Sequence, residues 1–163
     1  MKRTLATICL TIAVLLGSAG VSVSQDFQKG FDAWERGDFA IALREFTPLA
    51  EQGDADAQSN LGLMYRRGQG VPQDYKTAVK WYRLAAEQGN ALAQTNLGTM
   101  FFLGEGVIQD NVYAHMWWNI AASFGATLAV KNRDIVAKRM TPADISAAQK
   151  LVRECVEKNY RGC

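Results

Sequence analysis

The feature that most constrains the fold of this chain is an internal repeat with a period of 36 residues. Segments 55–90 and 91–126 match in register at their glycines, alanines and tryptophans. The matched pairs include Gly62 with Gly98, Ala78 with Ala114, and Trp81 with Trp117. A period of this length is typical of arrays in which each unit is one small supersecondary structure that buries its apolar face against its neighbours.

Each unit contains the pattern of two helices. Ala57, Leu61 and Met64 recur at steps of three and four residues, which predicts an amphipathic first helix. Gly68 should end that helix, because glycine accepts the left-handed backbone of a C-terminal cap. Asp74 precedes the second helix, where a short carboxylate can accept hydrogen bonds from free N–H groups. Asp110 stands at the same place in the next unit.

Two glycines lie inside the predicted first helices, where glycine costs about 1 kcal/mol relative to alanine. They are Gly62 and Gly98. We expect a steric reason for this cost, namely a close crossing with Ala78 and Ala114 on the second helix of each unit. The repeated tryptophans, Trp81 and Trp117, should then fill the space between adjacent hairpins.

Both units carry Ala-x-Ala-x3-Leu-Gly-x2-Tyr/Phe-x2-Gly-x-Gly-Val-x2-Asp-x3-Ala-x2-Trp-x3-Ala-Ala-x2-Gly. This pattern resembles the Sel1-like repeat family, whose members are related to tetratricopeptide repeats. The resemblance implies an all-α fold, a right-handed α-solenoid of antiparallel helical hairpins with a concave inner surface. The flanking segments extend this scheme: 25–54 is similar to a tetratricopeptide hairpin, since it lacks the Gly-x-Gly-Val loop, and 127–163 is predicted to be a C-terminal helical cap.

The N-terminal residues 1–24 have the layout of a secretory signal peptide. Lys2 and Arg3 precede an apolar run over 5–16, and small residues follow, so we expect cleavage after Ser24. A membrane-spanning helix would need roughly 18 consecutive apolar residues, which makes a stable membrane anchor the weaker interpretation. The chain is therefore expected in the periplasm of a bacterium, or secreted.

Charge and cysteines fit that expectation. Loss of residues 1–24 leaves 16 basic and 16 acidic residues, which does not favour nucleic acid as a partner.

Cleavage of the signal peptide also removes Cys9 and leaves Cys155 and Cys163. An even pair in an oxidising compartment favours an intramolecular disulfide. An intermolecular bridge and two free thiols are the alternatives.

The sequence contains no recognisable catalytic constellation. His115 is the only histidine, and a surface or half-buried helix position explains it better than a triad does. No set of converging ligands predicts a metal site, and no cofactor is expected. The Gly-x-Gly loops follow helices rather than strands, so they do not predict a nucleotide site. The elements of β-lactam-hydrolysing enzymes are also missing from the sequence.

The resemblance implies a ligand groove along the first helices of the hairpins. Carried over by position, the groove residues would be Phe31, Trp34, Ser59, Leu63, Arg66, Thr95, Thr99 and Phe102. Phe31 and Trp34 could instead be core residues of the N-terminal hairpin. Asn60 and Asn96 recur beside the groove, where hydrogen bonding between repeats is the favoured role and contact with a bound backbone the alternative.

The sequence thus predicts a non-enzymatic, exported adaptor that binds a protein or peptide partner rather than a small-molecule substrate. Two other functions remain open. One is an envelope enzyme that acts on peptidoglycan or a β-lactam, and the other is a secreted effector.

Overall fold

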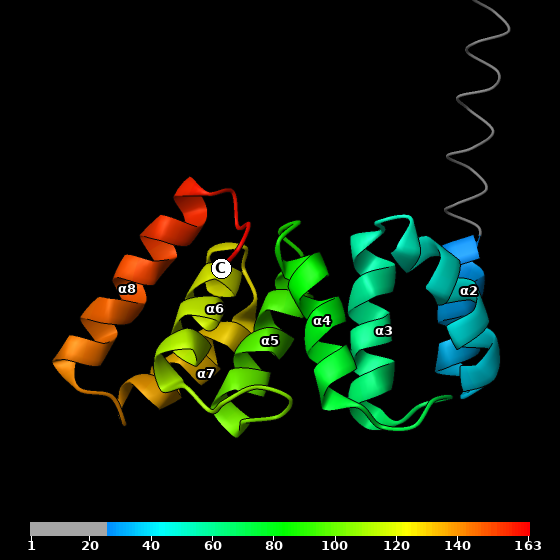
Figure 1. Ribbon diagram of the computed structural model, residues 1–163, viewed down its shortest axis with the longest axis horizontal. Helices are drawn as coiled ribbons and strands as arrows, with labels where there is room; N and C mark the ends of the chain where they lie inside the picture. The colour runs from blue at the N-terminus through cyan, green and yellow to red at the C-terminus, as the bar shows by residue number, and fades with distance from the viewer. Residues whose placement is uncertain (1–25) are drawn as a thin grey trace, which may run out of the picture.

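All regular secondary structure in residues 26–163, the part of the chain that the computed structural model describes, is α-helical. A first helix covers residues 26–35. The helices that follow it are α2 (Phe39–Glu51), α3 (Ala55–Arg67), α4 (Tyr75–Ala86), α5 (Ala91–Leu103), α6 (Asn111–Ser123), α7 (Thr127–Ala137) and α8 (Pro142–Glu157) (Figure 1). The predicted signal peptide, residues 1–24, lies outside the described residues.

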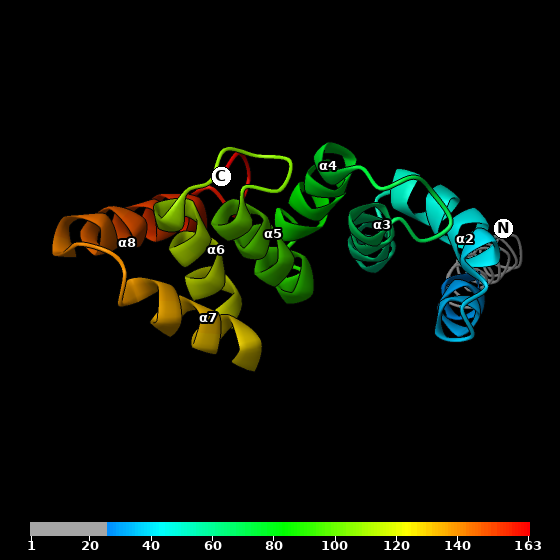
Figure 2. The same cartoon turned by 90° about the horizontal axis from the view of Figure 1, so that it is seen from below.

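The helices form a row of antiparallel hairpins. Helix α3 packs against α4 and α5 packs against α6, while α2 against α3 and α4 against α5 join one hairpin to the next. In Figure 2 the row curves, with residues 26–35 and α7 descending at its two ends and α3 and α5 between them. The architecture is the α-solenoid that the 36-residue period predicts.

Helix ends follow the predicted local chemistry. The Asp74 carboxylate accepts hydrogen bonds from the backbone N–H groups of Lys76 and Thr77, at 2.9 and 3.1 Å. Asp110 caps α6 in the same way. Gly68 ends α3 in the left-handed conformation, with φ +68°, and its N–H bonds the carbonyl of Met64. These caps explain why each unit breaks at the same places.

The glycines inside the first helices make room for an aromatic ring of the second helix. A Cβ at Gly62 would lie 2.6 Å from the Tyr82 ring, and one at Gly98 would lie 2.8 Å from the Trp118 indole. The Trp118 Nε1–H also donates to the Thr95 carbonyl at 3.0 Å. Trp118 therefore occupies the repeated aromatic position of Tyr82, which the sequence analysis did not recognise.

This packing corrects the predicted glycine–alanine crossing. Ala78 and Ala114 are fully buried, and the Ala114 carbonyl oxygen lies 3.2 Å from a Cβ placed on Gly98. The tightest neighbours of Gly62 and Gly98 are nevertheless the rings, because an aromatic side chain lies flat against a helix only where no Cβ projects.

The two repeated tryptophans differ in burial. Trp117 is almost fully buried within the larger apolar core of α4–α8. Trp81 is half-buried and packs against the smaller core formed by residues 33–64. Helix α8 packs directly on α6, so Trp117 lies on a helix that the C-terminal segment covers.

The Gly-x-Gly loops fasten each hairpin to the preceding one. A Cβ at Gly70 would lie 2.8 Å from the carbonyl oxygen of Phe39, the first residue of α2. A Cβ at Gly106 would collide with the carbonyl group of Tyr75, the first residue of α4. The second glycine of each loop therefore allows backbone to touch backbone between units.

Two buried glutamines at a repeated position, rather than the predicted asparagines, make equivalent hydrogen bonds to the preceding unit. The buried side chains of Gln58 and Gln94 donate to the carbonyls of Ala50 and Ala86, at 3.0 and 3.1 Å. These carbonyls belong to the last turns of α2 and α4, where they also accept the backbone N–H groups of Gly53 and Gly89, so each glutamine adds a second hydrogen bond to the same oxygen. Asn60 instead donates to the Asp56 carbonyl within its own helix.

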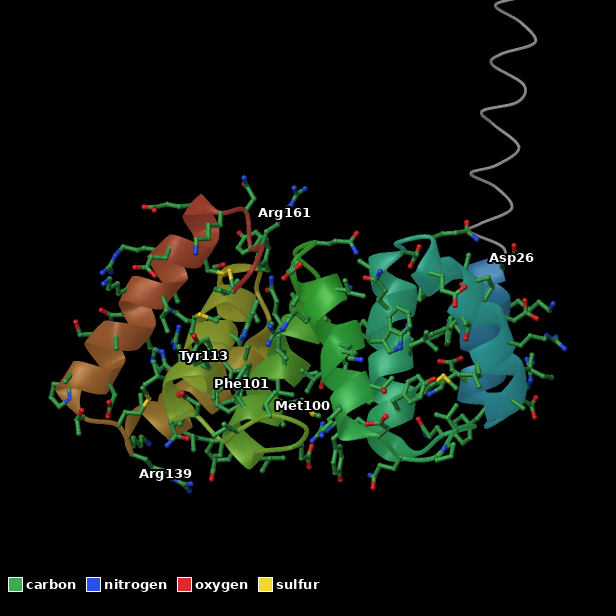
Figure 3. The ribbon with its side chains drawn as sticks, viewed as in Figure 1. Asp26, Met100, Phe101, Tyr113, Arg139 and Arg161 are labelled. Carbon is green, nitrogen blue, oxygen red and sulfur yellow. A yellow bond between two sulfur atoms is a disulfide. The ribbon has the colours of Figure 1, made fainter. Side chains whose placement is uncertain are left out.

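The C-terminal segment closes the row differently from a repeat. Both α7 and α8 pack on α6. Thr141 begins α8 with a capping box completed by Asp144. Cys155 and Cys163 form an intramolecular disulfide, visible as the yellow sulfur bond in Figure 3. The tail then returns to α4, where the Gly162 N–H donates to the Glu87 carboxylate at 3.1 Å.

Candidate functional site

Helices α3, α5 and α7, the first helices of their units, lie on the concave side of the row (Figure 2). Four repeat positions on each of them, counting the turn after α7, are exposed or half-buried. We call these twelve residues the concave strip. On α3 they are Asp56, Asn60, Leu63 and Arg67, and on α5 they are Leu92, Asn96, Thr99 and Leu103. On α7 they are Leu128, Asn132 and Ile135, and Arg139 follows in the turn after this helix. Each position recurs 36 residues later, although α7 lacks the repeat motif itself.

Some of the predicted groove residues lie on this strip and others do not. Leu63 and Thr99 belong to it, and Phe31 holds the corresponding place in the helix of residues 26–35. Ser59 and Thr95 are only 2% and 5% exposed, so the prediction that they face a ligand needs correction. The exposed stripe passes through Asn60 and Asn96 instead. The way in which neighbouring helices cross α3 and α5 decides which residues of these helices face outward.

Three further predicted groove residues contact the next unit of the row. The Trp34 Nε1–H donates to the Gln69 side chain at 3.2 Å, and Arg66 forms an ion pair with Glu105 at 2.8 Å. Phe102 packs with Trp118, the two ring centres being 5.7 Å apart. The Arg139 guanidinium lies 5.7 Å from the centre of the Phe102 ring. Trp34, Arg66 and Phe102 thus join neighbouring units along the edge of the strip.

The strip changes in character along the row. On α3 it carries an acid and a base, whereas on α5 and α7 half of its residues are leucine or isoleucine. Its large apolar side chains on these two helices are Leu92, Leu103, Leu128 and Ile135, with exposed fractions of 58%, 49%, 61% and 51%. A group of exposed apolar side chains on adjacent helices, rather than single scattered ones, is typical of a binding surface.

A pocket of about 340 Å³ opens between α5 and α7. Its lining residues are Thr99, Phe102, Leu103, Trp118, Asn132, Ile135 and Arg139. Arg139 lies where the chain passes from α7 to α8, at the lower edge of Figure 3. The repeated position of Arg139 is occupied by Arg67 on α3 and by Leu103 on α5, so the strip carries an arginine at each of its two ends and none on α5.

Two buried titratable groups, His115 and Tyr82, do not line this pocket. His115 is buried on α6, and burial together with the nearby Arg133 guanidinium lowers its pKa. The phenol of Tyr82 is buried beneath α3, which raises its pKa. Within residues 26–163, no three His, Cys, Asp or Glu side chains converge as a metal site. No helix in this range has the length and apolar character needed to cross a membrane.

The repeat units match a known family. The model of the Sel1 repeat matches residues 55–90 and 91–123. The chain contains two Sel1 repeats. Sel1 repeats generally mediate protein–protein interactions, and they are generally non-enzymatic scaffolds.

Solved Sel1 structures share the fold. A protective antigen present in uropathogenic Escherichia coli strains, which displays an SLR fold, is 29% identical, with a TM-score of 0.79 over 85% of this chain. A Sel1 repeat protein from Oxalobacter formigenes is 30% identical, with a TM-score of 0.63 over 66% of this chain. The matches span 31% and 44% of the lengths of those two proteins. No curated protein matches the sequence.

Proposed function

We propose that this Sel1 repeat protein is an exported, non-enzymatic scaffold of the bacterial cell envelope that binds a protein or peptide along the concave strip. The observation that carries the proposal is the apolar part of the strip on α5 and α7. Four large apolar side chains there are each about half exposed or more. The stability of the fold gives no reason to expose them together on adjacent helices. A protein partner would cover them and exclude water.

Export is supported by two features of the chain. The Cys155–Cys163 disulfide is a structural bridge of the kind that persists in oxidising compartments. The basic and apolar N-terminal segment has the composition of a signal peptide. Together these features favour the periplasm or the exterior of the cell.

A binding role also agrees with the chemistry of the surface. Neither the pocket nor the strip brings together a nucleophile, a base and an oxyanion donor. The near balance of acidic and basic residues does not favour a nucleic-acid partner. A protein or peptide partner needs only apolar contact area and a few polar groups that fix its register.

The test compares two substitutions that have the same chemistry, one on the concave strip and one off it. Leu92→Glu changes the concave strip, and Leu84→Glu changes an α4 side chain that is 46% exposed and lies off the strip. Cross-linked capture from the envelope of the source bacterium should lose specific partners with Leu92→Glu and keep them with Leu84→Glu. Equal partner sets for the two variants would refute the placement of the binding surface.

Two further measurements address the rest of the proposal. Fractionation of cells that express the full chain should find the processed protein outside the cytoplasm; unprocessed protein in the cytoplasm would refute export. Incubation of the purified protein with a β-lactam or with peptidoglycan should give no turnover. Turnover that copurifies with the protein would favour the envelope-enzyme alternative.

A further inference from the structure

The pocket between α5 and α7 combines an apolar wall with a single charge. Phe102, Leu103, Trp118 and Ile135 supply the apolar surface. Arg139 is the only charged residue in the lining, and none of the lining residues is acidic. A ligand that fits this pocket therefore needs an apolar group with a negative charge close to it.

Arg139 is held at the pocket without an acidic partner. Its guanidinium lies 5.7 Å from the centre of the Phe102 ring, within the range of a cation–π contact. Within residues 26–163, no carboxylate lies at ion-pair distance from it, whereas Arg66 and Arg133 pair with Glu105 and Asp134. The N–H groups of Arg139 are therefore available for a carboxylate of a ligand.

A polar group that can pair with a peptide backbone lines the same pocket. Asn132 is half-buried on α7, and its side-chain amide makes no hydrogen bond to any other group of residues 26–163. An amide offers one acceptor and two donors, which match the N–H and C=O of a peptide unit. A fatty acid would supply the apolar group and the charge but no such partner.

We propose that this pocket binds the C-terminal residue of a partner protein, with its apolar side chain against Phe102 and Ile135 and its α-carboxylate at Arg139. A C-terminal residue places an apolar side chain and a carboxylate on the same Cα, so one residue satisfies both halves of the pocket. Asn132 pairs with the preceding peptide unit. The inference rests on the proposed scaffold function and names the chemistry that its surface recognises.

The test uses two peptides that differ only in the terminal charge. The probes are Gly-Ser-Gly-Ser-Gly-Leu with a free carboxylate and the same peptide with a C-terminal amide, titrated into the full-length mature protein and followed by NMR chemical shifts. A charge-assisted hydrogen bond corresponds to roughly a tenfold or greater difference in affinity, so the acid should bind at least about ten times more tightly than the amide. The shifts should centre on α5 and α7.

Matched variants identify the group that reads the charge. Arg139→Gln should bring the acid and the amide to equal affinity. Lys131→Gln removes the same charge from an exposed position of α7 outside the pocket lining and should leave the preference intact. Ile135→Asp adds a carboxylate to the pocket and should weaken binding of the peptide with the free carboxylate. Because Ile135 is half-exposed, this change should leave the thermal unfolding midpoint within a few degrees of wild type.

Several results would overturn the inference. They are equal binding of acid and amide, absence of binding by both peptides, or an acid preference that survives in Arg139→Gln. Dodecanoate serves as a second probe. If it binds and the peptides do not, the pocket is assigned to a lipid instead. If these results occur while Leu92→Glu still loses captured partners, the scaffold function stands and only the C-terminal recognition fails.

Discussion

The second glycine of the Gly-x-Gly loop provides the sharpest test of how the units are joined. Gly106 has φ +73°, and a Cβ on it would collide with the Tyr75 carbonyl and lie 2.9 Å from the Lys76 nitrogen. Gly104, two residues earlier, has φ +72°, but its nearest neighbour to a Cβ is a side-chain carbon of Gln109 at 3.3 Å. The two glycines thus share a backbone conformation and differ in what surrounds them.

Alanine at each position separates the two effects. Gly104→Ala should cost about 1–2 kcal/mol, the cost of a left-handed conformation for a residue with a Cβ. Gly106→Ala should cost the same amount plus about 1–3 kcal/mol of overpacking, because the backbone atoms of Tyr75 and Lys76 cannot rotate away. We expect a total loss of about 3 kcal/mol or more for Gly106→Ala, and about half of that for Gly104→Ala.

Urea denaturation followed by circular dichroism measures both variants against wild type. At this chain length 1 kcal/mol shifts the thermal midpoint by about 4 °C, so melting curves give an independent check. If the two variants lose equal stability, within about 0.5 kcal/mol, the loop does not fasten one unit to the other as described, because then only the backbone conformation matters.

Three other perturbations follow from the packing. Trp117→Ala should lower the free energy of unfolding by about 3–5 kcal/mol, and Trp81→Ala should lower it clearly less, because Trp81 is only half-buried. Equal losses of unfolding free energy in urea denaturation would contradict the difference in core contacts. Cys163→Ser should lower the free energy of unfolding by about 2–3 kcal/mol, and dithiothreitol should destabilise wild type but not the variant; a variant as stable as oxidised wild type would exclude a structural role for the bridge. Burial lowers the pKa of His115, so the unfolded chain binds the proton more readily, and stability should fall as the pH drops below about 6.5. Denaturation at about pH 8 and about pH 5.5 should show a smaller difference for His115→Gln than for wild type, and an unchanged difference would assign the dependence to other groups.

Features set by local chemistry could be predicted from the sequence. The Asp74 and Asp110 caps, the left-handed Gly68 and the Thr141 start of α8 each depend on a few adjacent residues. The solenoid follows from the 36-residue period, because units with the same sequence pattern pack against their neighbours through the same contacts and so form a regular row. The same reasoning could have found the aromatic position, since Phe46, Tyr82 and Trp118 recur at that interval.

Features set by the relative orientation of helices could not be read from the pattern alone. Ser59 and Asn60 are neighbours in sequence, yet one is buried and the other is half-exposed on the strip. A residue step turns a helix by about 100°, so a small rotation at the crossing decides which of two adjacent residues faces outward. The same ambiguity explains why Gln58 and Gln94, rather than the asparagines two positions later, bond between repeats.

The tail that returns to α4 alters how this row of hairpins can come apart. In a linear stack each unit touches only its neighbours, so the terminal unit opens first and the others follow in order. Here the disulfide holds residues 155–163 in a closed turn, and Gly162 bonds Glu87 at a separation of 75 residues. Lifting α8 away therefore requires releasing the end of α4 as well, so the last helix and the first Sel1 repeat are tied into one opening event.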